Sequence, residues 1–257
     1  MSLVDERPAA SRPGVLPTPG AGSGARLRLL GGFELTVDGE AWDLPPAAAR
    51  LVAFLALQAR PLVRSHVAGV LWGDRTEERA GACLRSAIWR ANTGHGGRGA
   101  AVIRASRSRL ALAAISVDAL EAADAAHTQL VGGSPVAPEV LSGELLPGWY
   151  DDWVVVERER LRQVCLEGME QMAQTLLEAG LWHRAIEAAL YVVAAEPLRE
   201  SAHRVLIDAH VGAGNRGEAL RQFRICRALL ERELGLPPGP DLVAAAARAG
   251  GPSSGRR

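Results

Sequence analysis

Apolar and polar positions alternate with a helical period from Thr76 to Asn92. One face of the predicted helix carries small and aliphatic residues, namely Ala80, Leu84, Ala87, Ile88 and Ala91. The opposite face carries Arg79, Ala82, Ser86, Trp89 and Arg90. An apolar back and a small-residue front flanked by arginine are typical of a helix that packs on its own domain and enters a DNA groove. An ordinary amphipathic surface helix has the same period, so both interpretations remain open.

The chain before this helix predicts a small sheet followed by helices. Leu27–Val37 alternates apolar and polar positions, and Asp38-Gly39 then predicts a hairpin turn. A third short strand over Glu40–Leu44 would complete an antiparallel sheet. Pro45-Pro46 then opens a helix over Ala47–Ala59, with Leu51, Phe54, Leu55 and Leu57 on its buried side.

A second helix and a second hairpin flank the Thr76 helix. Arg64–Trp72 predicts a helix with Ser65 as N-cap and with Val67, Val70 and Leu71 as its apolar stripe. After the glycine-rich stretch 94–99, Val102–Leu112 predicts a hairpin with Ser106, Arg107 and Ser108 at its tip. A sheet, three helices and a hairpin predict a winged helix-turn-helix. Arginine at a hairpin tip suits contact with phosphates, although an exposed soluble loop would look the same.

The second half of the chain is predicted to be entirely helical. Val117–Val131 is helical, a turn-rich break follows, and a long helix covers Asp151–Ala179. A repeat with a 34-residue offset pairs Gly180 with Gly214 and Ala185 with Ala219. That period, with glycine ending one helix and alanine at the next crossing, is typical of tetratricopeptide repeats. Such repeats bind proteins or peptides, or they serve as a dimerisation or packing module.

Three aromatic residues, Trp149, Tyr150 and Trp153, precede and begin the long helix. They could form a partner-binding patch, but packing between the two halves of the chain is the favoured interpretation.

The net charge of zero hides an asymmetry between the halves. Residues 25–113 hold 13 Arg against 7 Asp plus Glu, and residues 114–257 hold 14 Arg against 20 acids. The resulting balances of +6 and −6 indicate a polyanionic partner for the first half. All 29 basic residues are arginine.

Other classes of chemistry find little support in the sequence. Cys83, Cys165 and Cys226 lack the spacing of a zinc site or disulfide framework, so we expect no metal and no cofactor. The six histidines show no catalytic spacing, and the absence of lysine excludes a Walker-type loop, so we expect no enzymatic activity. No run approaches a membrane span and no secretory signal opens the chain, which predicts a cytoplasmic, nucleoid-associated protein without a membrane partner.

Four segments of the first half resemble a known family: LLGGFELTVDG, LPPAAARLVAFLAL, VAGVLWGD and LRSAIWR. They are similar to the OmpR-type winged helix of the Streptomyces antibiotic regulatory proteins. Four segments of the second half resemble the bacterial transcriptional activation domain of the same family: LLPGWYDDWVVVERERLR, AAEPLRESAHRVLI, GNRGEALRQF and ERELGLPPGPDL. Because no nucleotide-binding segment follows, we expect a small, two-domain member.

The resemblance implies residue roles. The residues implied to face DNA bases or phosphates are Arg79, Ala82, Arg85, Ser86, Arg90, Arg107 and Arg109. The loop implied to touch RNA polymerase holoenzyme is Gly73, Asp74, Arg75 and Thr76. The resemblance also implies direct repeats in promoter DNA upstream of biosynthetic genes, and protomers arranged head to tail on them.

The expected fold is an α+β winged helix-turn-helix followed by an all-α tetratricopeptide-like domain. The expected boundaries are a disordered tail over 1–24, a DNA-binding domain over 25–113, an activation domain over 114–242 and a C-terminal tail over 243–257, which begins with a short helix. The expected function is sequence-specific transcriptional activation of biosynthetic or secondary-metabolite genes. The alternative is a protein-interaction adaptor whose winged helix no longer reads DNA. Glu77, Glu78 and Asn92, which depart from the family pattern, keep that alternative open.

Overall fold

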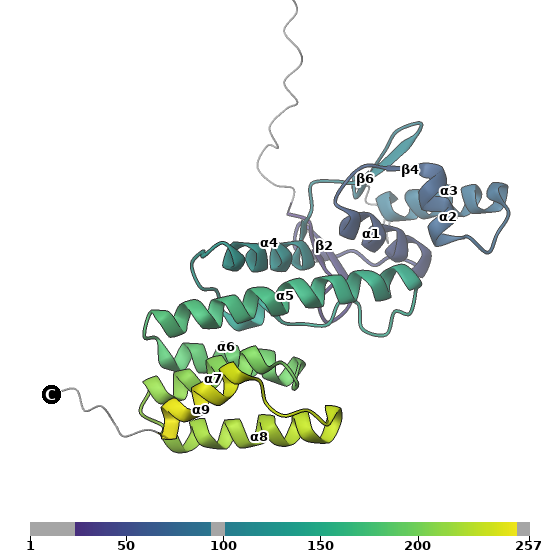
Figure 1. Cartoon of the computed structure of the whole chain (residues 1–257). Helices are drawn as coiled ribbons and strands as arrows, with labels where there is room; N and C mark the ends of the chain where they lie inside the picture. Colours follow the sequence, from purple (N-terminus) through teal and green to yellow (C-terminus); the bar gives the residue numbers. More distant parts are fainter. Residues whose placement is uncertain (1–23, 94–100, 251–257) are drawn as a thin grey trace, which may run out of the picture.

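The computed structural model describes residues 24–93 and 101–250. Figure 1 shows a mixed α/β part at one end and a stack of helices that leads away from it. Three predicted segments lie outside the described residues: the tail over 1–24 except for Gly24, the glycine-rich stretch 94–99, and residues 251–257 of the C-terminal tail.

The first sheet has the strand order β3-β2-β1-β7. Its strands are β1 (Arg26–Arg28), β2 (Glu34–Val37), β3 (Glu40–Ala41) and β7 (Ser116–Val117). The predicted turn is present between β2 and β3, where Asp38 and Gly39 have φ of 53° and 82°. Two positive φ angles match the twist of an antiparallel hairpin. The third strand was predicted to reach Leu44 but ends at Ala41, because the chain turns away toward the prolines that open α1.

The predicted winged helix-turn-helix is confirmed. Its helices are α1 (Pro46–Gln58), α2 (Arg64–Leu71) and α3 (Glu77–Thr93), and its second sheet has the order β4-β6-β5. The strands of that sheet are β4 (Leu62–Val63), β5 (Ile103–Ala105) and β6 (Arg109–Leu112).

Two details of the predicted α2 are wrong. Ser65 is not the N-cap: the helix already begins at Arg64, the cap position is Val63, and no side chain caps the helix. Val70 is 39% exposed, whereas Val67 and Leu71 are buried, because only their face of this short helix meets the core.

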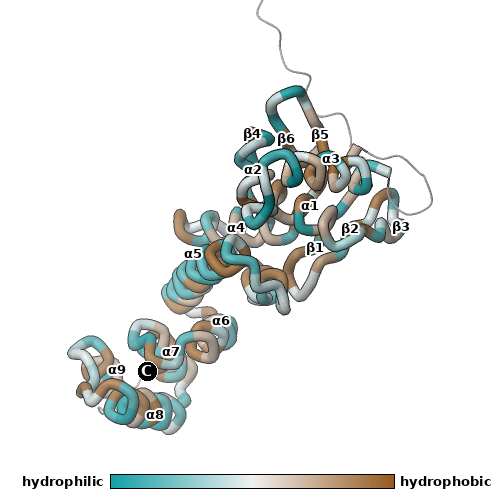
Figure 2. Tube along the Cα trace, turned by 90° about the vertical axis from the view of Figure 1, so that its right-hand side faces the viewer, coloured by the Kyte–Doolittle hydropathy of each residue, from teal (hydrophilic) through white to brown (hydrophobic). Residues whose placement is uncertain are grey.

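The second half is a layered stack of helices, as expected. Its elements are α4 (Asp118–Leu130), η1 (Pro138–Leu141), α5 (Asp152–Glu178), α6 (Trp182–Ala195), α7 (Glu200–Gly212), α8 (Arg216–Leu234) and α9 (Pro240–Gly250). Figures 1 and 2 both place α5 between the mixed α/β part and the more distant helices α6 to α9.

The 34-residue repeat appears as two helix pairs with the same turn. Gly180 and Gly214 have φ of 73° and 80°, a conformation that glycine adopts without strain. The next residues close both helices alike: Leu181 N donates to Leu176 O over 2.9 Å, and Asn215 N donates to His210 O over 2.8 Å.

The crossing alanines are fully buried, at 0% exposure for both Ala185 and Ala219. Their small side chains allow the neighbouring helices to approach closely, as the repeat pattern predicts.

Aromatic packing joins the two halves. Trp149 stacks on Phe33 with ring centroids 5.9 Å apart, and Trp153 meets Phe54 edge-on at 5.2 Å. The favoured interpretation is therefore confirmed for both tryptophans, whereas Tyr150 is 83% exposed. One core of buried residues runs from the first half of the chain to α7, and a second, smaller cluster joins α7, α8 and α9.

The predicted domain boundaries at 113 and 242 remain predictions, although the first sheet includes a strand that follows residue 113 and α9 runs across residue 242. β7 pairs in parallel with β1 of the first sheet, although it follows residue 113. Residues 243–250 belong to α9, in agreement with the short helix expected at the start of the C-terminal tail. The alanines at 245 and 249 are 0% and 2% exposed, because this helix covers α7 and α8.

Candidate nucleic-acid interface

The helix α3 presents the two predicted faces. Ala80, Leu84, Ala87 and Ala91 are buried against α1 and α2, while Ile88 is only half-buried. The face expected to meet DNA is exposed throughout, at Arg79, Ala82, Arg85, Ser86, Trp89 and Arg90. α3 therefore packs through one side and leaves its polar side open.

The C-terminal end of α3 is anchored from both sides. The indole Nε1 of Trp42 donates to Ala91 O over 3.0 Å. Asn92 uses its whole amide: Nδ2 donates to Ile103 O over 3.0 Å, and Ile103 N donates to Oδ1 over 2.8 Å. The hairpin of β5 and β6 is the wing, and β5 is an edge strand of the second sheet. Asn92 therefore satisfies the Ile103 backbone groups on that open edge. The departure from the family pattern at Asn92 thus has a structural role that the sequence did not reveal.

The wing is a tight hairpin. Ser106 N donates to Arg109 O over 2.8 Å, and Arg109 N donates to Ser106 Oγ over 3.0 Å. The closed turn leaves Arg107 and Arg109 exposed, as the predicted contact to phosphate requires, and Arg104 of β5 is exposed beside them.

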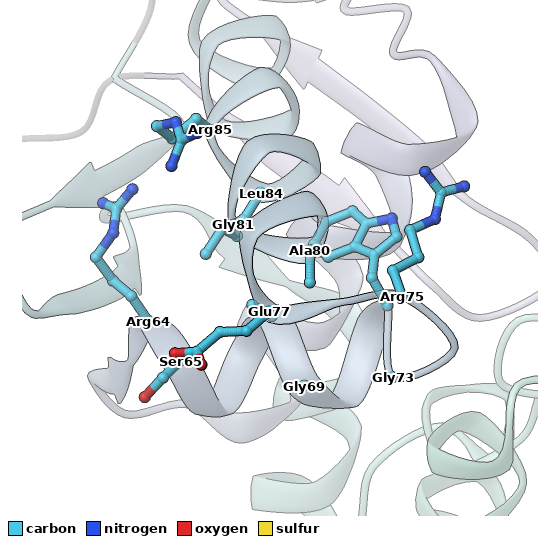
Figure 3. Close-up of a pocket in the computed structure, with 12 residues that line it drawn as sticks. Arg64, Ser65, Gly69, Gly73, Arg75, Glu77, Ala80, Gly81, Leu84 and Arg85 are labelled. Atoms are coloured by element: carbon cyan, nitrogen blue, oxygen red, sulfur yellow. The ribbon is translucent and has the colours of Figure 1, made fainter.

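A groove of about 540 Å³ separates α2 from α3. Figure 3 shows Arg64 and Arg85 on one side of α3 and Arg75 on the other. Arg85 folds back over Gly81, where an added Cβ would lie 3.5 Å from its Nη1.

Arg64 was not among the predicted site residues, yet it connects α2 to the wing tip. Its backbone N donates to Ser108 O over 3.0 Å, and its Nη1 donates to Ser106 O over 3.4 Å. No pattern in the sequence pointed to Arg64, because both of its contacts depend on how the hairpin folds back.

The loop predicted to touch polymerase is exposed at all four residues, Gly73, Asp74, Arg75 and Thr76. Trp72 before it is only 5% exposed and anchors it to the core. Arg75 N donates to Trp72 O over 3.1 Å, and Arg75 Nη1 lies 3.2 Å from Cys83 Sγ. The loop is therefore a short, well-anchored projection between α2 and α3.

The arginines of α3 and the β5–β6 hairpin differ in their partners from many other arginines of the described residues. In the helical half many are paired: Arg199 lies 2.7 Å from Glu170, Arg248 lies 2.7 Å from Asp208, and Arg162 pairs with two glutamates. Among the described residues, by contrast, none of the predicted contact arginines has a carboxylate within the 4.0 Å of an ion pair. These unpaired arginines are Arg79, Arg85, Arg90, Arg107 and Arg109. The face formed by α3 and the wing carries uncompensated positive charge.

The described residues offer little for other chemistry. Across 24–93 and 101–250, no three metal-ligating side chains are grouped to hold an ion. Burial raises the pKa of the Cys165 thiol to about 11, and burial followed by the nearby Glu200 charge does the same for Cys226. Within the same ranges, no helix is both long and apolar enough to cross a membrane.

The chain matches the family described as "Bacterial transcriptional activator domain" over residues 134–248. It is 29% identical over 251 residues to the regulatory protein AfsR of Streptomyces coelicolor. This alignment covers 91% of this chain and 25% of AfsR. It is 29% identical over 247 residues to AfsR of Streptomyces griseus, covering 88% of this chain and 24% of that protein. The chain thus spans about a quarter of the length of these relatives.

Its fold is similar to that of Mycobacterium tuberculosis EmbR, solved in complex with a low affinity phosphopeptide. The TM-score is 0.68 at 22% identity, over 88% of this chain and 65% of that chain. Residues 134–248 thus match a bacterial transcriptional activator domain, and the relatives that span both halves of the chain support its similarity to the Streptomyces antibiotic regulatory proteins.

Proposed function

We propose that this protein is a sequence-specific DNA-binding transcriptional activator that reads promoter DNA with α3 and the wing. The observation that carries the proposal is the set of unpaired arginines on that face. An arginine without a carboxylate partner can neutralise a phosphate without first breaking an ion pair. Each such contact releases counterions, so affinity should fall steeply with salt.

The shape of α3 supports base reading. Ala82 and Ser86 lie one turn apart on the exposed face, and their small side chains let the backbone approach base edges. Arg79 and Arg90 flank them near the two ends of the helix. Arg90 lies 5.2 Å from the ring of Trp89, which limits the freedom of its guanidinium group.

The remaining predicted residues suit contacts to the DNA backbone. Arg85 borders the groove between α2 and α3, while Arg107 and Arg109 extend from the wing. Arg64, which is hydrogen-bonded to the wing tip, joins this proposed set. Phosphate contacts fix the register of the protein, and the base contacts of α3 supply sequence specificity.

Activation would follow from contact between the 73–76 loop and RNA polymerase holoenzyme. The loop is exposed and anchored, so it can present the same surface whenever α3 is docked. We further propose that protomers bind direct repeats head to tail, upstream of biosynthetic genes. In this proposal residues 25–113 form the DNA-reading unit and residues 114–242 the activation domain.

The test is selection of genomic fragments by the purified protein at moderate salt, followed by sequencing of the retained DNA. The proposal expects an enriched direct repeat with a spacing of about one helical turn. Salt-sensitive retention without an enriched motif would contradict sequence-specific reading. Absence of retention would favour the adaptor function.

Variants then locate the contact face. Arg90→Ala should weaken operator binding by about tenfold, within the 1–3 kcal/mol of one base contact. Arg107→Ala should flatten the slope of log K against log salt by about 1. Arg227→Ala is the matched control, because it removes the same charge from an exposed position of α8. Equal effects of all three variants would show that only overall charge matters.

The polymerase contact has a separate test. Asp74→Ala changes an exposed loop residue that is outside the proposed DNA face. Operator affinity should stay the same, while promoter output in transcription with purified polymerase should fall several-fold. A variant that activates as well as the parent protein would exclude Asp74 from that contact.

A further inference from the structure

A second cavity, of about 460 Å³, lies where the two halves of the chain meet. Its wall is formed by Leu30, which follows β1, and by residues of α4, η1 with the segment after it, α5 and α6. Aliphatic and thioether side chains dominate its lining, among them Leu30, Leu141, Leu161, Leu166 and Met169. This size and lining are typical of a site for a small organic molecule, which needs a mostly apolar cavity with a few fixed polar groups.

Arg158 supplies the principal fixed polar group. Its Nε donates to Leu145 O over 2.8 Å, and its Nη2 donates to Leu146 O over 2.7 Å and to Trp149 O over 3.0 Å. These bonds hold the guanidinium group rigidly. Among the described residues its Nη1 makes no hydrogen bond, so that nitrogen can donate to a ligand.

The charged groups at this cavity are already paired. Arg158 Nε lies 3.5 Å from a carboxylate oxygen of Glu144. Arg162 lies 2.9 Å from Glu159 and also pairs with Glu196. Hydrogen bonding to Arg162 holds the pKa of Glu159 at about 2, so this pair persists at neutral pH.

A charged ligand would therefore find no unpaired countercharge to offset the loss of its hydration. An uncharged ligand loses little hydration on entering the cavity. The paired rim thus selects against ions of either sign.

We propose that this cavity binds an uncharged, largely apolar small molecule whose oxygen accepts a hydrogen bond from Nη1 of Arg158. The site would be distinct from the DNA face and does not depend on it. Its wall includes the connection between the halves: Gly31 N donates to Glu144 O, and Leu146 N donates to Leu29 O, both over 2.9 Å. A bound molecule would consequently touch the DNA-reading half through Leu30 and the helical half through α5 and α6.

The probe for this proposal is Nile red, an uncharged, apolar dye with one carbonyl oxygen. Fluorescence titration of the full chain should give saturable binding of one dye per chain. The anionic dye 1-anilinonaphthalene-8-sulfonate serves as the charge control and should bind at least tenfold more weakly. Equal or tighter binding of the anionic dye would overturn the proposed ligand class.

Two variants should close the cavity from exposed or half-exposed positions, so that the fold is kept. Ala195→Trp places an indole at the last residue of α6, and Ser142→Trp places one directly after η1. Both positions line the cavity. Each should weaken Nile red binding at least tenfold. Ala194→Trp is the matched control, since it adds the same side chain to the exposed neighbouring position outside the lining.

Circular dichroism melting confirms that each variant is folded. Two results would overturn the site by placing the dye elsewhere. One is dye binding that does not saturate; the other is equal binding by the parent protein and by both folded variants, Ala195→Trp and Ser142→Trp.

Discussion

Asn92 is expected to hold the β5–β6 hairpin against α3, and Asn92→Ala tests this role. The substitution removes two hydrogen bonds to the backbone of Ile103, of 3.0 and 2.8 Å. A typical protein hydrogen bond contributes about 1 kcal/mol net, whereas a dry, unsatisfied backbone group costs about 1–3 kcal/mol. Asn92 is only half-buried, so water can reach the vacated strand edge. We therefore expect a loss of about 2 kcal/mol, toward the lower of these limits.

The assay is urea denaturation combined with hydrogen exchange. Asn92→Ala should lower the unfolding midpoint and should increase exchange at the Ile103 amide, whose proton Asn92 accepts. Thr93→Ala is the matched control on the next, similarly half-buried residue of α3. If the wing then moves away from α3, the slope of DNA affinity against salt should also flatten.

An unchanged midpoint together with unchanged protection of Ile103 would refute the role assigned to Asn92. Loss of stability in the Thr93→Ala control to the same extent would show that the end of α3 is sensitive to any substitution.

Three further predictions concern packing and ionisation. Gly168→Ala should destabilise the protein by about 1–3 kcal/mol, because the new Cβ would lie 2.7 Å from the Cα of Ala126. Gly217→Ala is the control: its Cβ would meet open space, so this variant should be more stable than the parent protein in urea denaturation. Burial lowers the pKa of His203 below its usual 6.5, so the folded state binds fewer protons and the free energy of unfolding should fall as pH drops below 6.5. A His203→Gln variant with the same pH dependence would refute this assignment. Cys165, with its pKa raised to about 11, should resist thiol reagents at pH 8 until the chain unfolds.

Local patterns predicted much of the fold because they depend on near neighbours along the chain. The Asp38-Gly39 turn, the two faces of α3 and the glycines that end α5 and α7 follow from backbone conformation and helical period. The short helix expected after residue 242 is α9, but its start at Pro240 and its packing on α7 and α8 could not be predicted, because they depend on how the helical stack folds.

In the candidate site, too, local patterns could be predicted, whereas contacts that depend on tertiary folding could not. The exposed arginines of α3 and the wing could be named from periodicity and from the hairpin tip. Arg64 and Asn92 could not, because each acts through a hydrogen bond to the wing that depends on how the hairpin folds back. Asn92 was even counted against DNA reading, since the sequence alone showed only a missing positive charge.

The contacts between the halves bear on how such a protein would work on DNA. Separate domains usually move relative to each other unless a large apolar interface joins them. Here the core is continuous, and an ion pair between Arg50 and Asp151 adds to the packing of Phe54 on Trp153. The direction of the helical stack is therefore set by the direction of α3. On the proposed direct repeat, every docked protomer would hold its helical stack in the same orientation, so any contact between neighbouring protomers would join two different surfaces. A contact of this kind is head to tail, and it requires no two-fold symmetry in the operator.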